Sequence, residues 1–154
     1  MIEYNPKNST GYKRGFSISV NFAKARDYAV SMTGKINSKY KSTLWGIIVR
    51  GTNKNGYAFT ISNFGSYFLT YMGAANVVIG NLKRGSNKNI IWDKENTITL
   101  LVEGKDMTFY VNGEPLFVYE AGNNSQLEIS WQIWGGEGVV VSYELDNILV
   151  KEKP

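Results

Sequence analysis

Apolar and polar residues alternate with a period of two along much of this chain, and the pattern is clearest in residues 92–120. Residues 97–102 and 107–111 each alternate in this way, with Glu103–Asp106 as a turn between them. Asn112 and Gly113 follow, a pair that readily supplies the two positive φ angles of a tight hairpin turn. Residues 116–119 form the return. This segment therefore predicts three consecutive antiparallel strands.

Similar runs, bounded by Gly and Asn, recur about every 8–12 residues, which is typical of β-sandwiches. We expect further strands at residues 15–22, 27–36, 43–50, 57–62, 66–72, 76–80, 126–134 and 138–151, with the last one bent or split. Residues 81–89 are polar and basic and are expected to form a loop. No segment of useful length has a helical period. The pattern predicts an all-β fold of two stacked antiparallel sheets with about 11 to 13 strands.

The order of these segments resembles the concanavalin A-like, or laminin G-like, jelly rolls used as accessory domains by secreted bacterial proteins. The resemblance covers residues 27–150 and rests on residues 27–36, 45–51, 55–61, 97–113 and 139–150. Its most specific part is the Thr-Phe-Tyr-Val-Asn-Gly hairpin of residues 108–113, followed by the closing Asp-Asn-Ile-Leu-Val strand of residues 146–150. The superfamily includes lectins, glycoside hydrolases, carbohydrate-binding modules and protein-binding domains. The resemblance therefore implies a jelly-roll sandwich and leaves the activity open.

Length and charge fit one domain over residues 1–154. A chain of this length can bury a single core of its own. Residues 1–90 carry 13 Lys and Arg against two acids, whereas residues 91–154 carry four Lys against 11 acids. With no linker-like stretch near residue 90, we expect the two halves to interleave in one sandwich, with their charges paired across strands. The alternative is a basic face that attracts an anionic partner.

The chain contains no His and no Cys. This excludes serine–histidine triads, histidine-based zinc sites, thiolate nucleophiles and disulfides. Any catalysis would have to use carboxylates, Lys or Tyr. Galectin-type recognition also relies on a His, and the calcium and manganese cluster of the legume lectins is not visible either.

Aromatic residues are abundant, and several fall on expected strands. Trp134 shares a strand face with polar residues, including Gln132, so it is a candidate platform for a sugar ring. Tyr57 and Tyr71 could join it. Arg50 or Gln132 would then donate hydrogen bonds to the ligand. Trp45 is a further candidate, and core packing is the alternative for each of these aromatic residues.

Carboxylates give weaker candidates. Retaining glycosidases need two carboxyl groups about 5–5.5 Å apart. Glu144-Leu145-Asp146 begins like the acidic strand of the jelly-roll glucanases, but positions 148 and 149 are Ile and Leu, so the second acid is missing. Asp146 and Asn147 are weak candidates for a structural calcium, with an ordinary turn or strand-end hydrogen bond as the alternative.

Basic residues could attract an anionic polymer. Lys83, Arg84 and Lys88, with Lys35, Lys39 and Lys41, could mark a nucleic acid or an anionic polysaccharide. Since no nucleic-acid motif accompanies them, solvated loops are the simpler interpretation.

These observations favour a non-catalytic carbohydrate-binding module without a cofactor, whose partner is an oligo- or polysaccharide, neutral or anionic. The alternative is a structural or protein-interaction domain of a surface, secreted or phage assembly, and the third hypothesis is a glycoside hydrolase. The chain has no run long and apolar enough for a membrane helix and no signal-peptide pattern. We therefore expect an extracellular or cell-surface module of a larger protein, with an intracellular protein as the alternative. The oligomeric state is left open.

Overall fold

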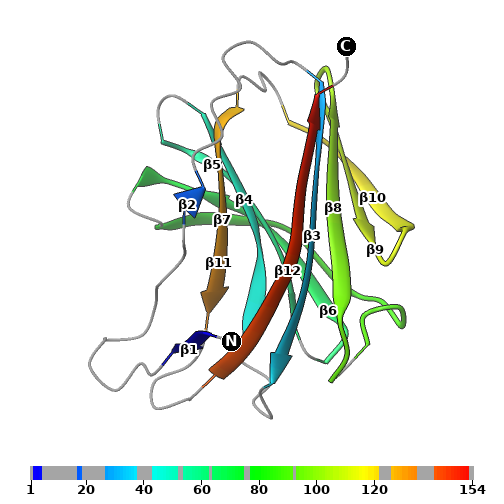
Figure 1. Cartoon of the computed structure of the whole chain (residues 1–154). Coiled ribbons are helices and arrows are strands. Elements are labelled where there is room, and N and C mark those ends of the chain that lie inside the picture. The colour runs from blue at the N-terminus through cyan, green and yellow to red at the C-terminus, as the bar shows by residue number, and fades with distance from the viewer. Residues whose placement is uncertain are drawn as a thin grey trace.

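The computed structural model describes residues 2–4, 17–18, 27–37, 43–51, 54–62, 64–74, 77–91, 93–121, 126–134 and 141–152. These residues form two antiparallel sheets that pack face to face (Figure 1). The strands of the first sheet, in spatial order, are β1 (Ile2–Tyr4), β12 (Val141–Glu152), β3 (Tyr28–Asn37), β8 (Asn96–Glu103), β9 (Asp106–Val111) and β10 (Glu114–Glu120). The strands of the second sheet are β2 (Ser17–Ile18), β11 (Gln126–Trp134), β4 (Leu44–Gly51), β5 (Gly56–Ser62), β6 (Ser66–Met72) and β7 (Val78–Ser86). The predicted all-β sandwich is confirmed.

Both sheets combine strands from the basic and the acidic half of the chain. In the first sheet, β3 lies between β12 and β8, and in the second, β4 lies between β11 and β5. Lys35 and Asp93, one from each half, form an ion pair at 3.6 Å. The predicted interleaving of the two halves is therefore confirmed, whereas the pairing of their charges across strands stays a prediction, because Asp93 lies in a turn before β8.

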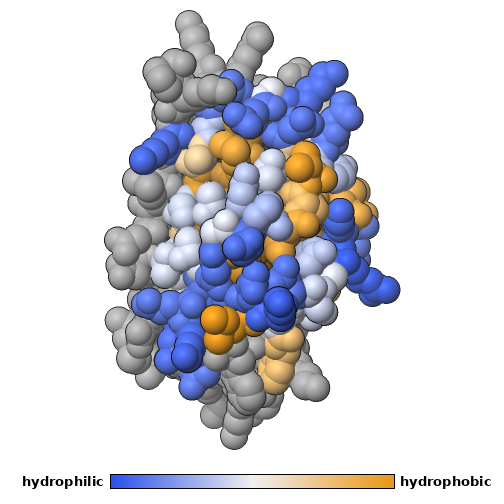
Figure 2. All heavy atoms as spheres, turned by 90° about the vertical axis from the view of Figure 1, so that its right-hand side faces the viewer, coloured by the Kyte–Doolittle hydropathy of each residue, from blue (hydrophilic) through white to orange (hydrophobic). Residues whose placement is uncertain are grey.

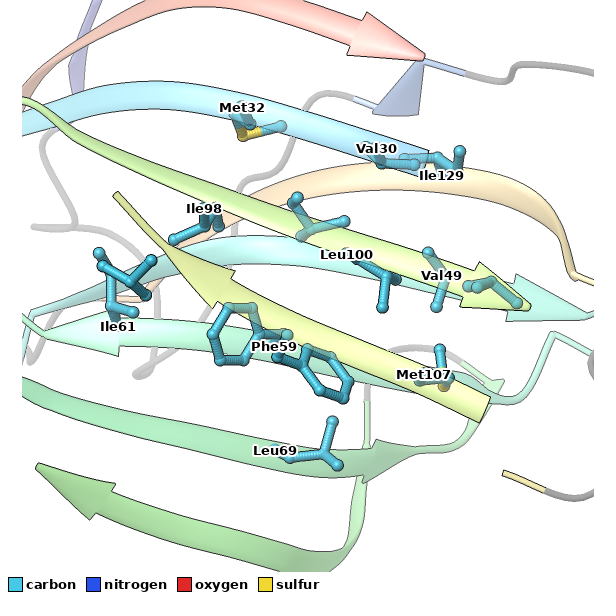
Figure 3. Packing of buried hydrophobic residues seen from close by; sticks show 14 of the residues in the cluster. Val30, Met32, Val49, Phe59, Ile61, Leu69, Ile98, Leu100, Met107 and Ile129 are labelled. Carbon is cyan, nitrogen blue, oxygen red and sulfur yellow. The ribbon is translucent and has the colours of Figure 1, made fainter. Parts of the chain in front are cut away.

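The core lies between the sheets and follows from the period-two pattern. Along β8 and β9, buried and partly exposed residues alternate, as expected for strands with one face on a core. Figure 3 shows Phe59 and Leu69 of the second sheet packing toward Leu100 and Met107 of the first. The rings of Phe59 and Phe109 join the two sheets, with their centroids 4.7 Å apart.

The β9–β10 hairpin turn has the predicted backbone. Asn112 and Gly113 both have positive φ, 52° and 84°, as a tight hairpin turn of this kind requires. The Asn112 side chain strengthens the turn, because its oxygen accepts a hydrogen bond from the backbone N–H of Thr97 at 2.7 Å. The hairpin is thus fixed by backbone conformation and by a side-chain bond.

One predicted loop is wrong. Residues 81–86 continue the strand that begins at Val78, and the turn comes only after Ser86. β7 is an edge strand that pairs with β6 alone and is largely exposed, so its polar residues meet water without interrupting the ladder. Irregular register at two points along the β6–β7 pair further weakened the alternation that the prediction used.

Residues 138–140, where the last strand was expected to begin, lie outside the described residues. The last strand, expected to be bent or split, is a single strand with a register shift between Asp146 and Ile148. The part of the chain that the structure describes contains no helix long and apolar enough to cross a membrane.

Candidate functional site

The six residues predicted to bind a ligand occupy strand positions on two opposite faces of the second sheet. Directly paired residues share a face, and neighbours along a strand alternate. By the register of β11, β4, β5 and β6, one face takes Arg50, Gln132 and Trp134, and the opposite, core-facing side takes Trp45, Tyr57 and Tyr71. The six residues therefore do not form one site.

Trp45 is a buried core residue. Only 3% of it is exposed, and it belongs to the main core cluster with Ile47 and Ile61. An aromatic platform must be open to its ligand, so the prediction that Trp45 binds a sugar is wrong. The alternative of core packing holds.

Arg50 supports two loops from within the protein. It is 5% exposed, and its Nη1 donates hydrogen bonds to the carbonyl oxygens of Lys54 at 2.8 Å and Gly73 at 3.1 Å. These bonds tie the β4–β5 connection to the residue that follows β6. The prediction of Arg50 as a hydrogen-bond partner for a sugar is therefore replaced by a structural role.

Gln132 and Trp134 lie on β11, where they pair with Gly46 and Leu44 of β4. Their side chains are outside the described part of the structure. Their place in a sugar site stays a prediction.

Tyr57 and Tyr71 do come together, and Tyr119 joins them. The Tyr57 ring centroid lies 5.3 Å from that of Tyr71 and 5.7 Å from that of Tyr119. Tyr57 and Tyr71 belong to β5 and β6 of one sheet and Tyr119 to β10 of the other, and all three are half-buried. We call these three residues the tyrosine cluster.

Burial is the main cause that raises the pKa of Tyr57, and the neighbouring Tyr119 and Tyr71 raise it further. The Tyr57 hydroxyl therefore stays protonated throughout the physiological range. It can donate one hydrogen bond and accept others, as sugar hydroxyls require.

A second aromatic group continues the tyrosine cluster along the same side of the sandwich. Phe117 stacks on Tyr67 with ring centroids 5.4 Å apart, and the Lys83 Nζ lies 4.6 Å from the centroid of the Phe117 ring. Register places Gly80 opposite Tyr71 and Gly85 opposite Tyr67. β7 and β10 are the last strands of their sheets, so this side is the open edge of the sandwich.

We call this strip the open seam and define it by Gly80, Lys83 and Gly85 of β7 and Phe117 and Tyr119 of β10. Figure 2 views the molecule from the side on which β9 and β10 lie in Figure 1, and apolar side chains appear there among hydrophilic ones. The sequence pattern did not indicate Tyr119 as a candidate, nor the contact of Lys83 with Phe117. The two-residue spacing of Phe117 and Tyr119 was a usable signal, because it puts both on one face of a strand.

The carboxylate and calcium candidates belong to the other sheet. Glu144 pairs with Lys35, and Asp146 pairs with Thr33, both across β12 and β3. The side chains of Glu144, Asp146 and Asn147 are outside the described residues. Among the side chains that are described, no three His, Cys, Asp or Glu residues are placed to hold a metal ion. The weak calcium prediction stays a prediction.

The basic residues singled out in the sequence are dispersed. Lys83 is on the core-facing side of β7, whereas Arg84 pairs with Phe68 on the opposite face, and Lys88 is in the turn that follows. Lys35 is on the other sheet, and Lys39 and Lys41 lie outside the described residues. The basic residues that the structure describes therefore do not form one continuous basic face.

The architecture is similar to that of several carbohydrate-active proteins. Sheep galectin-11, solved in complex with glycerol, superposes with a TM-score of 0.65 at 10% identity, over 91% of this chain and 99% of the galectin. The carbohydrate-binding module CBM66 from Bacillus subtilis gives 0.62 at 12% identity, over 94% of this chain and 98% of the module. Alginate lyase A1-II', a member of polysaccharide lyase family 7, gives 0.65 at 10% identity, over 97% of this chain and 78% of the lyase.

No family model matches the chain, and no curated protein matches it in sequence. The structural matches show that the chain has the concanavalin A-like jelly-roll fold, as the resemblance implied. At this level of identity the likeness extends to the fold alone.

Proposed function

We propose that this protein is a non-catalytic carbohydrate-binding module that holds a glycan against the tyrosine cluster. The observation that carries the proposal is the contact of Tyr57, Tyr71 and Tyr119 at the open edge of the sandwich. The apolar face of a sugar ring packs well on an aromatic ring, and phenol hydroxyls at the edge bond to sugar hydroxyls. A galectin and a carbohydrate-binding module with the same fold support this class of function.

Catalysis is the second candidate, because the alginate lyases share the fold as well. Without His or Cys, a catalytic site in this chain would depend on carboxylates, Tyr or Lys. A turnover assay on a panel of polysaccharides separates the two candidates. Steady release of products by the wild type, lost on changing Tyr71 or Glu144, would replace the binding module with an enzyme.

As to location, we propose an extracellular or cell-surface module within a larger protein, since glycan polymers are abundant there. No cofactor is part of this proposal.

The test begins with a glycan array and then measures affinity for a hit by calorimetry. We expect Tyr71→Ala to weaken binding by about tenfold, or roughly 1.4 kcal/mol, because an aromatic contact with the ligand is lost. Tyr71→Phe keeps the ring and should lose less. Tyr110→Ala, at a partly exposed position of β9 that pairs with Thr99, is the matched control and should leave the affinity unchanged.

Circular dichroism establishes that each variant is folded. The proposal fails if no glycan binds, or if Tyr71→Ala and Tyr119→Ala both leave the affinity unchanged. If Trp134→Ala alone abolishes binding, the function stands and the site moves to the opposite face of the second sheet.

A further inference from the structure

The open seam has an exposed cation held at a defined place. The Lys83 Nζ lies 4.6 Å from the centroid of the Phe117 ring, on the core-facing side of β7. A cation placed in this way is attracted by the ring face. The contact orders the long lysine side chain over the aromatic strip, although Lys83 itself is on an exposed edge strand.

Two glycines keep the seam from being filled by side chains of β7. At Gly80, opposite Tyr71, an added Cβ would meet no atom within 4 Å, so the space beside the ring is free. At Gly85, an added Cβ would collide with the ring of Tyr67, which lies over the glycine. Between these two glycines, Lys83 pairs with the buried Leu69, so its side chain lies on the side of β7 that faces the seam.

Carboxylates of the described residues do not neutralise this cation. The ion pair between Lys35 and Asp93 does not involve Lys83, and Lys83 forms no ion pair with a carboxylate of the described residues. On β10, Glu120 pairs with Asp106, whereas its neighbour Tyr119 pairs with the buried Met107, so Glu120 and Tyr119 occupy opposite faces. Arg84 and Lys88 are exposed nearby in the chain and add to the positive potential around β7.

We propose that the open seam selects acidic glycans, with a sugar ring on Tyr71 and Tyr119 and the carboxylate or sulfate of that sugar or its neighbour paired with Lys83. This proposal rests on the proposed function and specifies its ligand class. An ammonium beside an aromatic surface complements a ligand that carries an apolar ring face and an anionic group together. Neutral glycans would pack on the aromatic rings but would form no ion pair with Lys83.

Matched pairs of polysaccharides test the charge preference. Calorimetry of the full chain compares polygalacturonate with its methyl ester, and dextran sulfate with dextran, so that each pair differs only in its anionic groups and the pairs separate uronate from sulfate. We expect the acidic member of at least one pair to bind about tenfold tighter, the size of one charge-assisted bond.

A matched lysine exchange tests the position of the charge. Lys83→Gln should remove most of that preference. Lys94→Gln removes the same charge from an exposed turn outside the seam and should change binding to the acidic polymer less than about twofold. Gly80→Leu fills the open space beside Tyr71 and should weaken acidic and neutral glycans alike.

The results separate this proposal from the function on which it rests. If neutral glycans bind as well as acidic ones and depend on Tyr71, the charge preference is wrong and the carbohydrate-binding function stands. If Lys83→Gln and Lys94→Gln weaken binding equally, the attraction is diffuse and the assignment to Lys83 is overturned. If polyglutamate binds as tightly as the acidic glycans, the seam recognises anionic chains rather than sugars. If glycans bind but the affinity does not depend on Tyr71 or Tyr119, the ligand lies outside the seam and this proposal fails. If no glycan binds, both proposals fail.

Discussion

Tyr28 of β3 is 1% exposed, and burial raises the pKa of its hydroxyl well above its ordinary value. The pKa of Tyr57 shifts in the same direction. The folded protein therefore holds these protons to a higher pH than the unfolded chain does, whose tyrosines titrate at about pH 10. Their stabilising contribution is complete below that pH and is lost as the pH rises toward the folded pKa values.

We expect Tyr28→Phe to flatten this alkaline loss of stability. The buried Tyr28 contributes a slope of up to about 1.4 kcal/mol per pH unit in the affected range. Urea unfolding at several pH values between about 9 and 12 measures the slope. Tyr110→Phe, at a partly exposed position, is the control. Equal slopes for the wild type and Tyr28→Phe would contradict the assignment.

For single residues, the sequence indicated which side chains have suitable chemistry for a binding site, but not whether each of them is buried or exposed. Tyr57 and Tyr71 were predicted to belong to one site and do contact one another, whereas their binding of a ligand stays a prediction. Trp45 and Arg50 were equally reasonable by type, but Trp45 is in the core, and Arg50 donates its hydrogen bonds to backbone carbonyls. Burial of a single residue depends on what packs against it from elsewhere in the chain, which alternation alone does not give.

Among the elements, the β8–β9–β10 meander was predictable because each strand has one buried face and the turns carry their own signals. β7 was not, since an edge strand exposed on most of its length does not need alternation. The same loss of pattern led to the prediction of a loop around Lys83, which was singled out for its charge but lies on β7 and packs over Phe117.

The β9–β10 turn gives a test at the level of one element. Gly113 has φ of 84°, where a residue with a Cβ is strained, so Gly113→Ala should cost about 1–2 kcal/mol. Gly80→Ala is the matched control, because its added methyl meets no atom within 4 Å. Urea unfolding measures both variants. A cost for Gly113→Ala no larger than that for Gly80→Ala would show that the turn does not depend on the left-handed conformation.

For the molecule as a whole, the fold could be predicted from period-two burial and turn residues, whereas the arrangement of the candidate site could not. The open seam is built from β7 and β10, which belong to different sheets and meet only when the sandwich closes. No local pattern links Tyr119 to Tyr57, although their rings lie 5.7 Å apart in the folded protein. The sequence therefore indicated aromatic residues as candidates, but not the surface on which they come together.

The measurement that tests this account most directly is an NMR titration of the full chain with a glycan identified on the array. If the glycan lies in the open seam, the largest amide shift changes should fall on Gly80, Lys83 and Tyr119. The amide chemical shifts of Leu44 and Gly46, which pair with Trp134 and Gln132, should not change. Chemical-shift changes centred on Leu44 and Gly46, without changes in the open seam, would contradict the account. They would place the ligand on the opposite face of the second sheet.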